Sequence, residues 1–460
     1  MSDHSILEPT LKEILNVIYP LREDWDIRMG IINELRSVVQ SVESLRGAIV
    51  EPFGSFVSNL FTRWGDLDIS IELLNGSHIS SLGKMRKQTL LGELLKTLRK
   101  RGGLRRFHFI QNARVPILKF ESSRQNISCD ISMDNMAGLM KSRLLFWINA
   151  VDERFRDMVL LVKEWAKAHD VNNPKTGSFN SYSLSLLVIF HFQTCVPAIL
   201  PPLRDIYPGN LVDDLKGVRA TAERNIAETC AANIARFRSE NRTINRSSLS
   251  KLFVSFVAKF SDLHLKAPEL GICPFTGSWE RIASITRWLP NNHAIFIEDP
   301  FEQPENSARA VSVKELERIS EAFMMTHHRL TTPNQNKYCI LTTLIKQQTL
   351  QFMVGSPVSY PNYNGQHRRN RPQVHQAVHS PARVQHHQSP SQAVHSPARV
   401  QHHQPPFVRS ESSRPNRLSV QPVQQPVQQS VQQPGQQFSS QIGRQKHRQA
   451  RRLWRPKHDR

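Results

Sequence analysis

The stretch PFGSFVSNLFTRWGDLDISI, residues 52–71, carries the pattern that decides the fold. Apolar residues at 48–50 precede it and predict a short buried strand. Gly54-Ser55 then predicts a turn, and residues 56–61 predict a short helix. A Gly-Ser turn that leads into a helix offers backbone N–H groups and a hydroxyl to a phosphate. The first half of the stretch therefore indicates a phosphate-binding turn at the end of a strand.

The second half of the stretch predicts a strand with two carboxylates on one face. Polar and apolar residues alternate through 66–71, which places Asp66 and Asp68 side by side on the polar face. The same alternation through 126–133 places Asp130 on the polar face of another short strand. Carboxylates this close repel one another, and hard divalent cations such as Mg²⁺ prefer carboxylate and phosphate oxygens. Three such aspartates indicate a two-metal site for a nucleoside triphosphate.

In combination these features resemble the active-site signature of the DNA polymerase β-type nucleotidyltransferases. The residues that carry the resemblance are Gly54, Ser55, Asp66, Asp68 and Asp130. Within that superfamily, residues 7–346 resemble the noncanonical poly(A) polymerases and the terminal uridylyltransferases, including the plant enzymes that tail unmethylated small RNAs. The resemblance implies that the three aspartates are catalytic and hold two Mg²⁺ or Mn²⁺ ions. It also implies that the Gly-Ser turn cradles the β- and γ-phosphates.

The resemblance further implies a nucleotide site on the segments that follow. Lys163 and Lys167 in the VKEWAK stretch match a lysine pair that faces the triphosphate. Ser181-Tyr182 matches a pair whose hydroxyl lies near the phosphates and whose ring stacks on the base. Read without the resemblance, these residues are ordinary, namely a solvated lysine face and a tyrosine at the edge of the core. The full set of expected nucleotide-binding residues is Gly54, Ser55, Asn135, Lys141, Ser142, Lys163, Lys167, Ser181, Tyr182, Asp299 and Glu305.

Base choice is expected to depend on the stretch IFIEDPFEQPENSAR, residues 295–309. It resembles the nucleotide-recognition loop of the poly(A) polymerase-associated domain, in which Asp299 contacts the base edge directly or through water while Glu302 and Asn306 hold the loop. Its ordinary interpretation is an acidic turn, because Asp-Pro and Gln-Pro favour turns. Glu305 stands where uridine-preferring relatives often carry a histidine, which weakens a UTP assignment made from this loop alone.

A second departure from the family pattern is Lys141. Lys141 stands beside Ser142 where some relatives use an asparagine to contact the base and the ribose. We favour uridine because the whole core, this pair included, resembles the plant small-RNA enzymes. Two alternatives stay open: an adenylyltransferase of the same architecture, which Glu305 keeps in consideration, and a non-catalytic RNA-binding protein, which the complete set of three aspartates disfavours.

Composition bounds the partners of the 460-residue chain. Its net charge of +21 indicates a polyanion, nucleic acid before membrane. Residues 356–460 hold 16 Lys and Arg against two acidic residues, so the charge is concentrated there. The five cysteines include no CxxC pair, which argues against a zinc site or a disulfide framework. No signal peptide is apparent at 1–10, and the longest apolar run, 184–200, is too short and interrupted to span a membrane.

The same patterns predict four segments. We expect helices at 1–45 that pack with a helical domain, an α/β palm with a mixed sheet at 46–140, a mostly helical poly(A) polymerase-associated domain at 141–346, and a disordered tail at 347–460. The tail contains a 13-residue repeat, QAVHSPARVQHHQ, at 376–388 and 392–404, and then a Gln/Pro tract. Such segments have too few apolar residues to offset the entropy of ordering.

The expected function is template-independent addition of UMP from UTP to the 3′ ends of single-stranded RNA, since no separate template-binding domain is apparent. The resemblance implies unmethylated small RNAs and cleaved RNA fragments as substrates, and their decay as the result. It also implies an Argonaute protein as a partner, no membrane partner, and a location in the nucleus and cytoplasm that includes RNA-processing bodies.

Overall fold

The structure is a computed structural model that describes residues 6–73, 78–79, 82–123, 126–333 and 336–354. All of them belong to one compact unit of the chain, residues 1–366. The predicted tail with its repeats, from residue 355 on, lies outside the described residues. None of the described helices combines the length and the apolar character that crossing a bilayer requires.

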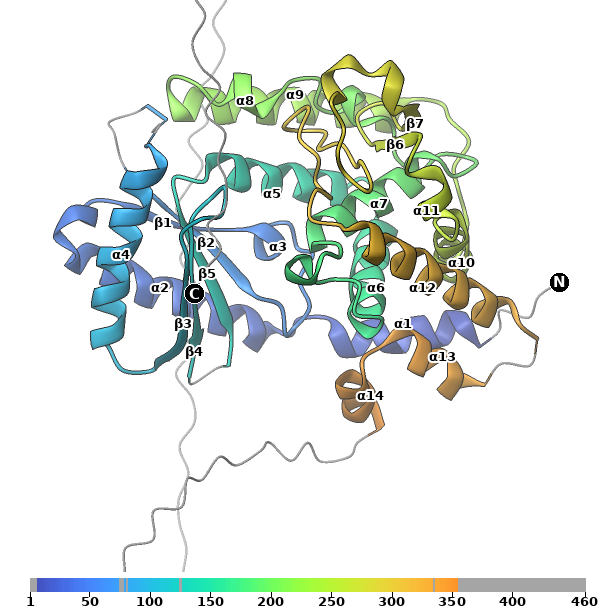
Figure 1. Ribbon diagram of the computed structural model, residues 1–460, viewed down its shortest axis with the longest axis horizontal. Coiled ribbons are helices and arrows are strands. Elements are labelled where there is room, and N and C mark those ends of the chain that lie inside the picture. The colour runs from blue at the N-terminus through green and yellow to red at the C-terminus, as the bar shows by residue number, and fades with distance from the viewer. Residues whose placement is uncertain (1–5, 74–77, 80–81, 124–125, 334–335, 355–460) are drawn as a thin grey trace, which may run out of the picture. The chain divides into compact units, whose positions relative to one another are not determined.

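A five-stranded mixed sheet forms the palm, with the strand order β1-β2-β5-β4-β3 (Figure 1). β2 and β5 are parallel, and the other neighbours are antiparallel. α2 and α4 supply the apolar side chains that pack with the sheet. The palm elements are β1 (Ile49–Phe53), α3 (Gly54–Val57), β2 (Leu67–Glu72), α4 (Lys84–Lys100), β3 (Leu104–Ile110), β4 (Ile117–Ser122) and β5 (Ser128–Met133), preceded by α2 (Arg22–Ser41).

Strand alternation decides which palm side chains face the site. Leu67, Ile69 and Ile131 are fully buried in the palm core. Successive side chains of a strand point to opposite faces. Asp68 and Asp130, which lie between these apolar residues, therefore belong to the face of the sheet away from that core. The predicted helix at 84–100 is confirmed by α4, whereas the predicted helix at 56–61 is observed earlier and shorter, as α3.

A larger apolar core holds the mostly helical remainder together. α6 and α7 lie at its centre, and every residue of α7 from its third position on is buried. Asn180 caps α7 by accepting a hydrogen bond from the Ser183 amide at 2.8 Å. The elements are α1 (Leu7–Ile18), α5 (Met136–Asn149), α6 (Arg154–Ala168), α7 (Ser181–Gln193), α8 (Leu211–Asp214), α9 (Arg219–Ser239), α10 (Leu249–Lys259), α11 (Leu263–Lys266), β6 (Leu270–Cys273), β7 (Ser278–Arg281), α12 (Val313–Thr331), α13 (Lys337–Leu344) and α14 (Gln347–Val354).

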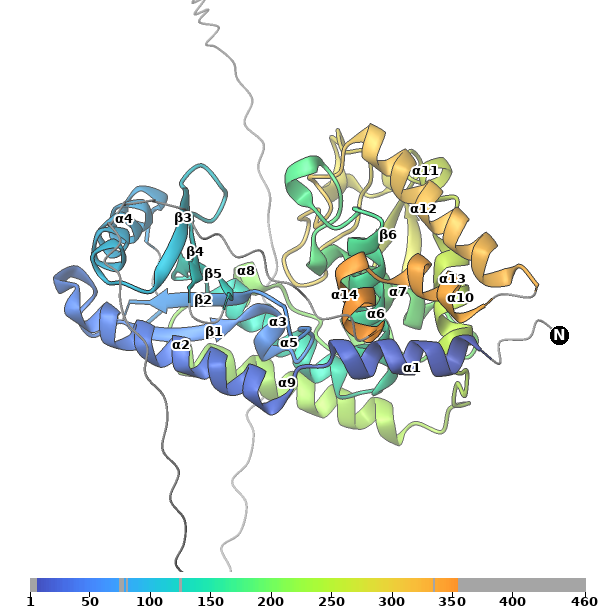
Figure 2. The same cartoon turned by 90° about the horizontal axis from the view of Figure 1, so that it is seen from below.

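The two N-terminal helices pack on different cores, although the sequence led us to expect both on the helical domain. α1 does contribute its apolar side chains to the helical core. The prediction is wrong for α2, whose apolar stripe, which includes Leu35 and Val38, belongs to the palm core. Figure 2 shows α1 running along the helical domain and α2 along the sheet. An apolar stripe predicts burial but not which partner buries it.

Two predicted domain limits also differ from the structure. The limit between residues 140 and 141 falls inside α5, and the Met140 side chain already belongs to the helical core. The limit at 346 is too early, because α14 continues the fold: Leu350 is buried and the Thr349 hydroxyl donates to Glu164 at 2.6 Å. The helical domain therefore begins within α5 and extends through residue 354.

Candidate active site

The three predicted aspartates gather where β2 and β5 lie side by side, and we call them the acidic edge. Asp68 and Asp130 are register partners in the parallel pair, and Asp66 comes directly before β2. Desolvation, followed by the charges of Asp130 and Asp66, raises the pKa of Asp68 to about 7. Desolvation and Asp130 also raise the pKa of Asp66. The acidic edge therefore favours either bound protons or a nearby positive charge.

Lys119 supplies part of that positive charge, and the sequence analysis missed it. It lies on β4 as the register partner of Asp130, and its ammonium forms an ion pair with Asp130 Oδ2. Its charge also lowers the pKa of Asp66 and of Asp68 against the effects that raise them. A signal was present, since Lys119 alternates with buried Leu118 and Phe120 and so falls on the polar face. Its pairing with Asp130 depended on the strand register, which the sequence did not provide.

The residues of the acidic edge fit divalent cations by the chemistry of their donors. Hard cations take oxygen ligands, and these are three carboxylates on adjacent strands. Asp130 Oδ1 is buried with no hydrogen-bond partner among the described residues, so one ligand oxygen is free. Within the same residues, no group of three or more His, Cys, Asp or Glu is arranged closely enough to hold an ion as it stands. Lys119 instead takes the second oxygen of Asp130.

The Gly-Ser turn lies directly against the acidic edge. Gly54 has a φ of +67°, and a Cβ at this position would overlap the carboxylate of Asp68, so only glycine allows this approach. The Gly54 amide donates to Ser142 Oγ at 2.6 Å, and that hydroxyl donates to Gly138 O at 2.6 Å. The Gly54 amide is thus engaged within the fold, whereas the Ser55 hydroxyl has no partner among the described residues.

A buried arginine holds the turn that carries Asp66. Arg28 of α2 is fully buried, and its Nη2 donates to Arg63 O at 3.1 Å and to Gly65 O at 2.6 Å. Its guanidinium also lies 4.8 Å from the centre of the Phe61 ring. Arg28 therefore positions Asp66 from α2, a helix that the sequence analysis did not connect with the site.

The lysine pair of α6 approaches the same edge. Lys163 is buried, and its Nζ donates to Leu60 O at 2.8 Å. Desolvation, and then the charge of Lys167, lowers the pKa of Lys163 to about 7, while Asp68 acts in the opposite direction. Lys167 is more exposed and lowers the pKa of Asp66. The structure thus brings both predicted lysines into electrostatic range of the aspartates.

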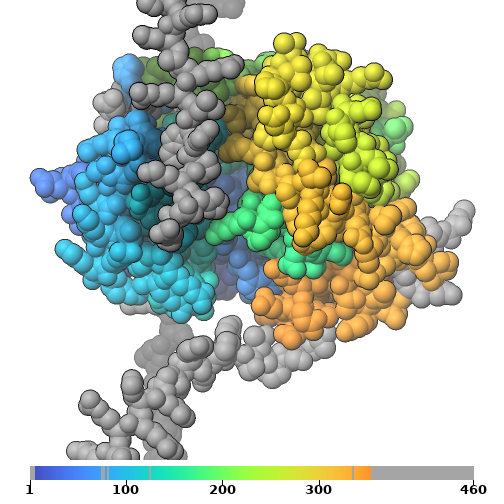
Figure 3. All heavy atoms as spheres, viewed as in Figure 1, coloured from blue at the N-terminus to red at the C-terminus, as the bar shows by residue number. Residues whose placement is uncertain are grey.

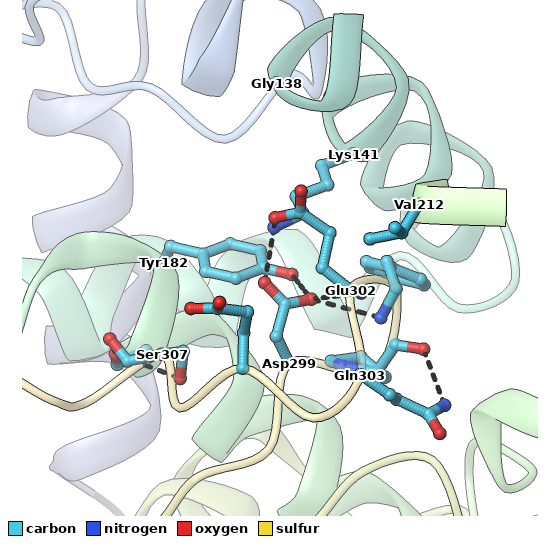
Figure 4. Close-up of polar contacts among 12 residues, drawn as sticks. Gly138, Lys141, Tyr182, Val212, Asp299, Glu302, Gln303 and Ser307 are labelled. Carbon is cyan, nitrogen blue, oxygen red and sulfur yellow. Dashed lines mark hydrogen bonds and ion pairs between the residues drawn. The ribbon is translucent and has the colours of Figure 1, made fainter. Parts of the chain in front are cut away.

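A second group of charged residues lies between α5, α7 and the loop at 295–309, and we call it the Lys141 cluster (Figure 4). The Lys141 ammonium pairs with both Asp299 and Glu302. The Tyr182 hydroxyl donates to Asp299 Oδ1 at 3.0 Å. Burial and the charge of Asp299 raise the pKa of Tyr182. Burial would raise the pKa of Glu302 as well, but Lys141 and Arg114 hold it below its usual value.

The loop that carries Asp299 is held from inside by Asn306. Its side-chain oxygen accepts from Ile297 N at 3.1 Å and from Ala308 N at 2.9 Å, and its amide group donates to Ile295 O at 2.8 Å. This confirms the expectation that Asn306 holds the loop. The Glu305 carboxylate is 43% exposed and does not pair with Lys141: it pairs with Arg309 at 3.0 Å and, at 4.0 Å, with Arg114, which also pairs with Glu302.

Asn135 and Ser181, both predicted to bind the nucleotide, have local partners. Asn135 caps α5 by accepting from Gly138 N at 3.2 Å, and Ser181 Oγ accepts from Asn172 Nδ2 at 3.2 Å. Of the other predicted residues, the Gly54-Ser55 turn and the lysine pair of α6 lie beside the acidic edge, Ser142 bonds the Gly54 amide, and Lys141, Tyr182 and Asp299 belong to the Lys141 cluster. In the space-filling view, the surface is hollowed between the blue palm and the yellow and orange part of the helical domain (Figure 3).

Comparison with known proteins places both parts of the chain. Residues 7–149 match the family model of the mitochondrial-like poly(A) RNA polymerase central palm domain. The chain is 59% identical to the protein HESO1 of Arabidopsis thaliana over 84% of its own length and 75% of that protein. It is 27% identical to the terminal uridylyltransferase cid1 of Schizosaccharomyces pombe, over 70% of this chain and 78% of that protein.

Solved structures show the same fold. A structure of the Cid1 poly(U) polymerase with bound MgGTP aligns with a TM-score of 0.58 and 23% identity, covering 75% of this chain and 99% of that one. A structure of mtPAP in complex with UTP aligns with a TM-score of 0.56 and 20% identity, covering 74% of this chain and 69% of that one.

Proposed function

The chain belongs to the family of noncanonical poly(A) polymerases and terminal uridylyltransferases within the DNA polymerase β-type nucleotidyltransferases, and from this premise we propose that it adds UMP from UTP to RNA 3′ ends. The observation that carries the chemistry is the pairing of Asp68 with Asp130 across parallel strands, directly against the Gly54 turn. The uridine assignment is supported by the similarity to a terminal uridylyltransferase over most of both chains.

We propose that Asp66 and Asp68 hold two divalent cations, Mg²⁺ or Mn²⁺, and that Asp130 holds the one nearer the RNA. A relative of the same fold has been solved with a magnesium nucleotide. The chemistry that such cations supply is a lower pKa for the attacking hydroxyl and charge stabilisation for the leaving pyrophosphate. The free Oδ1 of Asp130 is the oxygen that the chain would offer to the cation that activates the RNA 3′ hydroxyl.

The triphosphate is proposed to lie between the Ser55 turn and α6. Lys163 and Lys167 then offset its negative charge. Such a charge would counter the desolvation and the neighbouring Lys167 charge, which lower the pKa of Lys163. The Ser55 hydroxyl, which has no partner among the described residues, is available to a phosphate oxygen. Tyr182, the second residue of α7, offers a ring on which the base stacks.

We propose unmethylated small RNAs and cleaved RNA fragments as the natural substrates, with addition that needs no template. An Argonaute protein as partner and action in both nucleus and cytoplasm belong to the same proposal. Its support is the resemblance of the whole core, and the 16 basic residues at 356–460 suit an RNA ligand.

The deciding experiment is extension of a single-stranded RNA with each of the four nucleoside triphosphates separately, first with Mg²⁺ and then with Mn²⁺. We expect extension with UTP well above that with the other three. Extension mainly with ATP would retain the fold and the aspartates but identify an adenylyltransferase. Absence of extension with every nucleotide would contradict the enzymatic proposal altogether.

A further inference from the structure

Both oxygens of the Asp299 carboxylate are engaged by donors within the fold. Its Oδ1 accepts from the Tyr182 hydroxyl at 3.0 Å, from Phe301 N at 3.1 Å and from Glu302 N at 3.3 Å. Its Oδ2 pairs with the Lys141 ammonium. Each oxygen of an ionised carboxylate offers about two acceptor sites, so the three donors saturate Oδ1, and Oδ2 is engaged by the Lys141 ammonium. Asp299 is also only 4% exposed. It therefore acts as a holder of Lys141 and Tyr182 rather than as a group that reads the base directly.

Lys141, in contrast, keeps one donor free. An ammonium group has three N–H donors and no acceptor. Two of them go to Asp299 and Glu302, and no third acceptor is found among the described residues. The Lys141 Nζ lies 5.3 Å from the centre of the Tyr182 ring, the surface on which the base is proposed to stack. Figure 4 shows Lys141 and Tyr182 meeting over Asp299. The free N–H is therefore within reach of the edge of a stacked base.

We infer that Lys141 is the residue with which this chain selects uracil over cytosine and adenine, by donating a hydrogen bond to the 4-keto oxygen of the base. The inference rests on the proposed function. Uracil carries a carbonyl oxygen at position 4, where cytosine carries an amino group, and adenine carries an amino group at the corresponding position. An amino group facing the ammonium leaves two donors without an acceptor, which costs more than the loss of one hydrogen bond.

The carboxylates of Asp299 and Glu302 fix the position of the Lys141 ammonium. They hold the ammonium in one place, so it cannot swing away from an amino group of the base. Glu305, the residue at the histidine position, is paired with Arg309 outside the cluster. The chain thus places its keto-reading donor on α5 instead of on the loop. Guanine also carries a keto oxygen, so Lys141 by itself separates keto bases from amino bases and leaves guanine to be excluded by size.

The test compares UTP with CTP in the K141M variant of the full chain. These nucleotides have the same size and share every group except those at positions 3 and 4 of the ring. We expect the ratio of kcat/KM for UTP to that for CTP to fall roughly 10- to 100-fold, the range for one charged hydrogen bond. The ratio is independent of the fraction of protein that is folded. K141R, which keeps charged donors, should retain most of the ratio.

The matched control is K216M, which removes the same charge from an exposed lysine of the same domain that pairs with Asp213 at 3.0 Å. It should leave the ratio unchanged. If K141M does not fold, K141Q replaces it, because an amide offers an acceptor as well as a donor and should therefore also lose the ratio. A wild-type ratio in the folded variant would overturn the inference.

A modified nucleotide tests the same hydrogen bond from the other side. The triphosphate of 2-pyrimidinone riboside lacks the 4-oxygen. Wild-type protein should use it less well than UTP. In K141M the ratio of kcat/KM for UTP to that for the analogue should be at least roughly tenfold smaller than in wild type, as in a double-mutant cycle. Equal discrimination by both proteins would overturn the role of Lys141 while leaving uridylyl transfer intact. A wild-type preference for ATP in the extension assay would instead overturn the proposed function.

Discussion

The acidic edge and the Lys141 cluster are both groups of buried or half-buried charges, but only one of them is balanced. At the acidic edge, Lys119 forms an ion pair with Asp130 alone, the pKa of Asp68 rises to about 7, and Asp130 Oδ1 has no partner among the described residues. In the Lys141 cluster, every oxygen of Asp299 has a donor, and the Glu302 carboxylate is held ionised by Lys141 and Arg114. The acidic edge, where the chemistry is proposed to occur, thus keeps uncompensated carboxylates, whereas the charges of the Lys141 cluster, where the base is proposed to be selected, are already paired.

The difference follows from what each end has to do. A site for divalent cations must keep carboxylate oxygens free. The mutual repulsion of neighbouring carboxylates is part of what favours cation binding. A site that selects a base must present one donor in one position, which requires that the group holding it be fixed by other contacts. The charge imbalance at Asp68 thus suits cation binding, and the pairing of Asp299 suits base selection.

The largest expected effect comes from removing the acidic edge. D66A combined with D68A should lower RNA extension more than about 1,000-fold, because the residues that hold the cations are gone. Thermal unfolding without added metal should occur at the same temperature as in wild type or slightly higher, since repelling charges are removed. Extension by the double variant at the wild-type rate would mean that the acidic edge has no part in catalysis.

A smaller effect is expected when the Gly54 turn is moved away from the edge. In G54A the new Cβ overlaps the Asp68 carboxylate, and an L-residue at a φ of +67° is strained. We expect extension to fall about 100-fold and unfolding free energy to fall by about 1–2 kcal/mol. The control is G83A, where the φ is −63° and a Cβ meets open space. Wild-type kinetics in G54A, measured beside that control, would show that close contact between turn and edge is dispensable.

Loosening the loop at 295–309 should affect the Lys141 cluster, and therefore nucleotide binding, but not the acidic edge. N306A removes the side-chain bonds to Ile297, Ala308 and Ile295 that hold the loop beside the Lys141 cluster. We expect the KM for UTP to rise about tenfold with a much smaller change in kcat, and unfolding free energy to fall by about 1–3 kcal/mol. Steady-state kinetics separates these terms. A fall in kcat with an unchanged KM would mean that the two regions are not as independent as their contacts indicate.

The smallest effect concerns pH and metal. The pKa of Asp68 is raised from 3.8 to about 7 in the folded, metal-free protein, so folding favours the protonated form. Its contribution to stability is present in full below pH 3.8 and is lost as the pH rises through 7. Added Mn²⁺ binds the ionised form and should raise Tm by roughly 5 °C more at pH 8 than at pH 5.5.

Scanning calorimetry across this pH range, with and without Mn²⁺, measures that difference. D68N carries no titrating group at this position and serves as the control, so its metal-dependent shift in Tm should vary little with pH. A larger shift at pH 5.5 than at pH 8 in the wild type would contradict the assignment of a raised pKa to Asp68.

Local pattern was sufficient to predict the acidic edge. Alternation with a period of two puts Asp68 and Asp130 on one face whatever the strands pack against, because successive side chains of a strand point in opposite directions. The requirement for glycine at position 54 was likewise foreseeable from a turn between a strand and a helix. These features depend on neighbours within a few residues, and they also carry the resemblance to the nucleotidyltransferases.

By itself, then, the sequence determined the palm strands, the three aspartates, the lysine pair of α6 and the family. Only the tertiary structure decided that α2 packs on the palm, that Lys119 pairs with Asp130, and that Lys141 joins Asp299 from 158 positions away along the chain. The physical reason is range. Alternation and turn chemistry act between near neighbours, whereas the partner of a buried charge is whichever group the packing of distant elements brings within hydrogen-bonding distance.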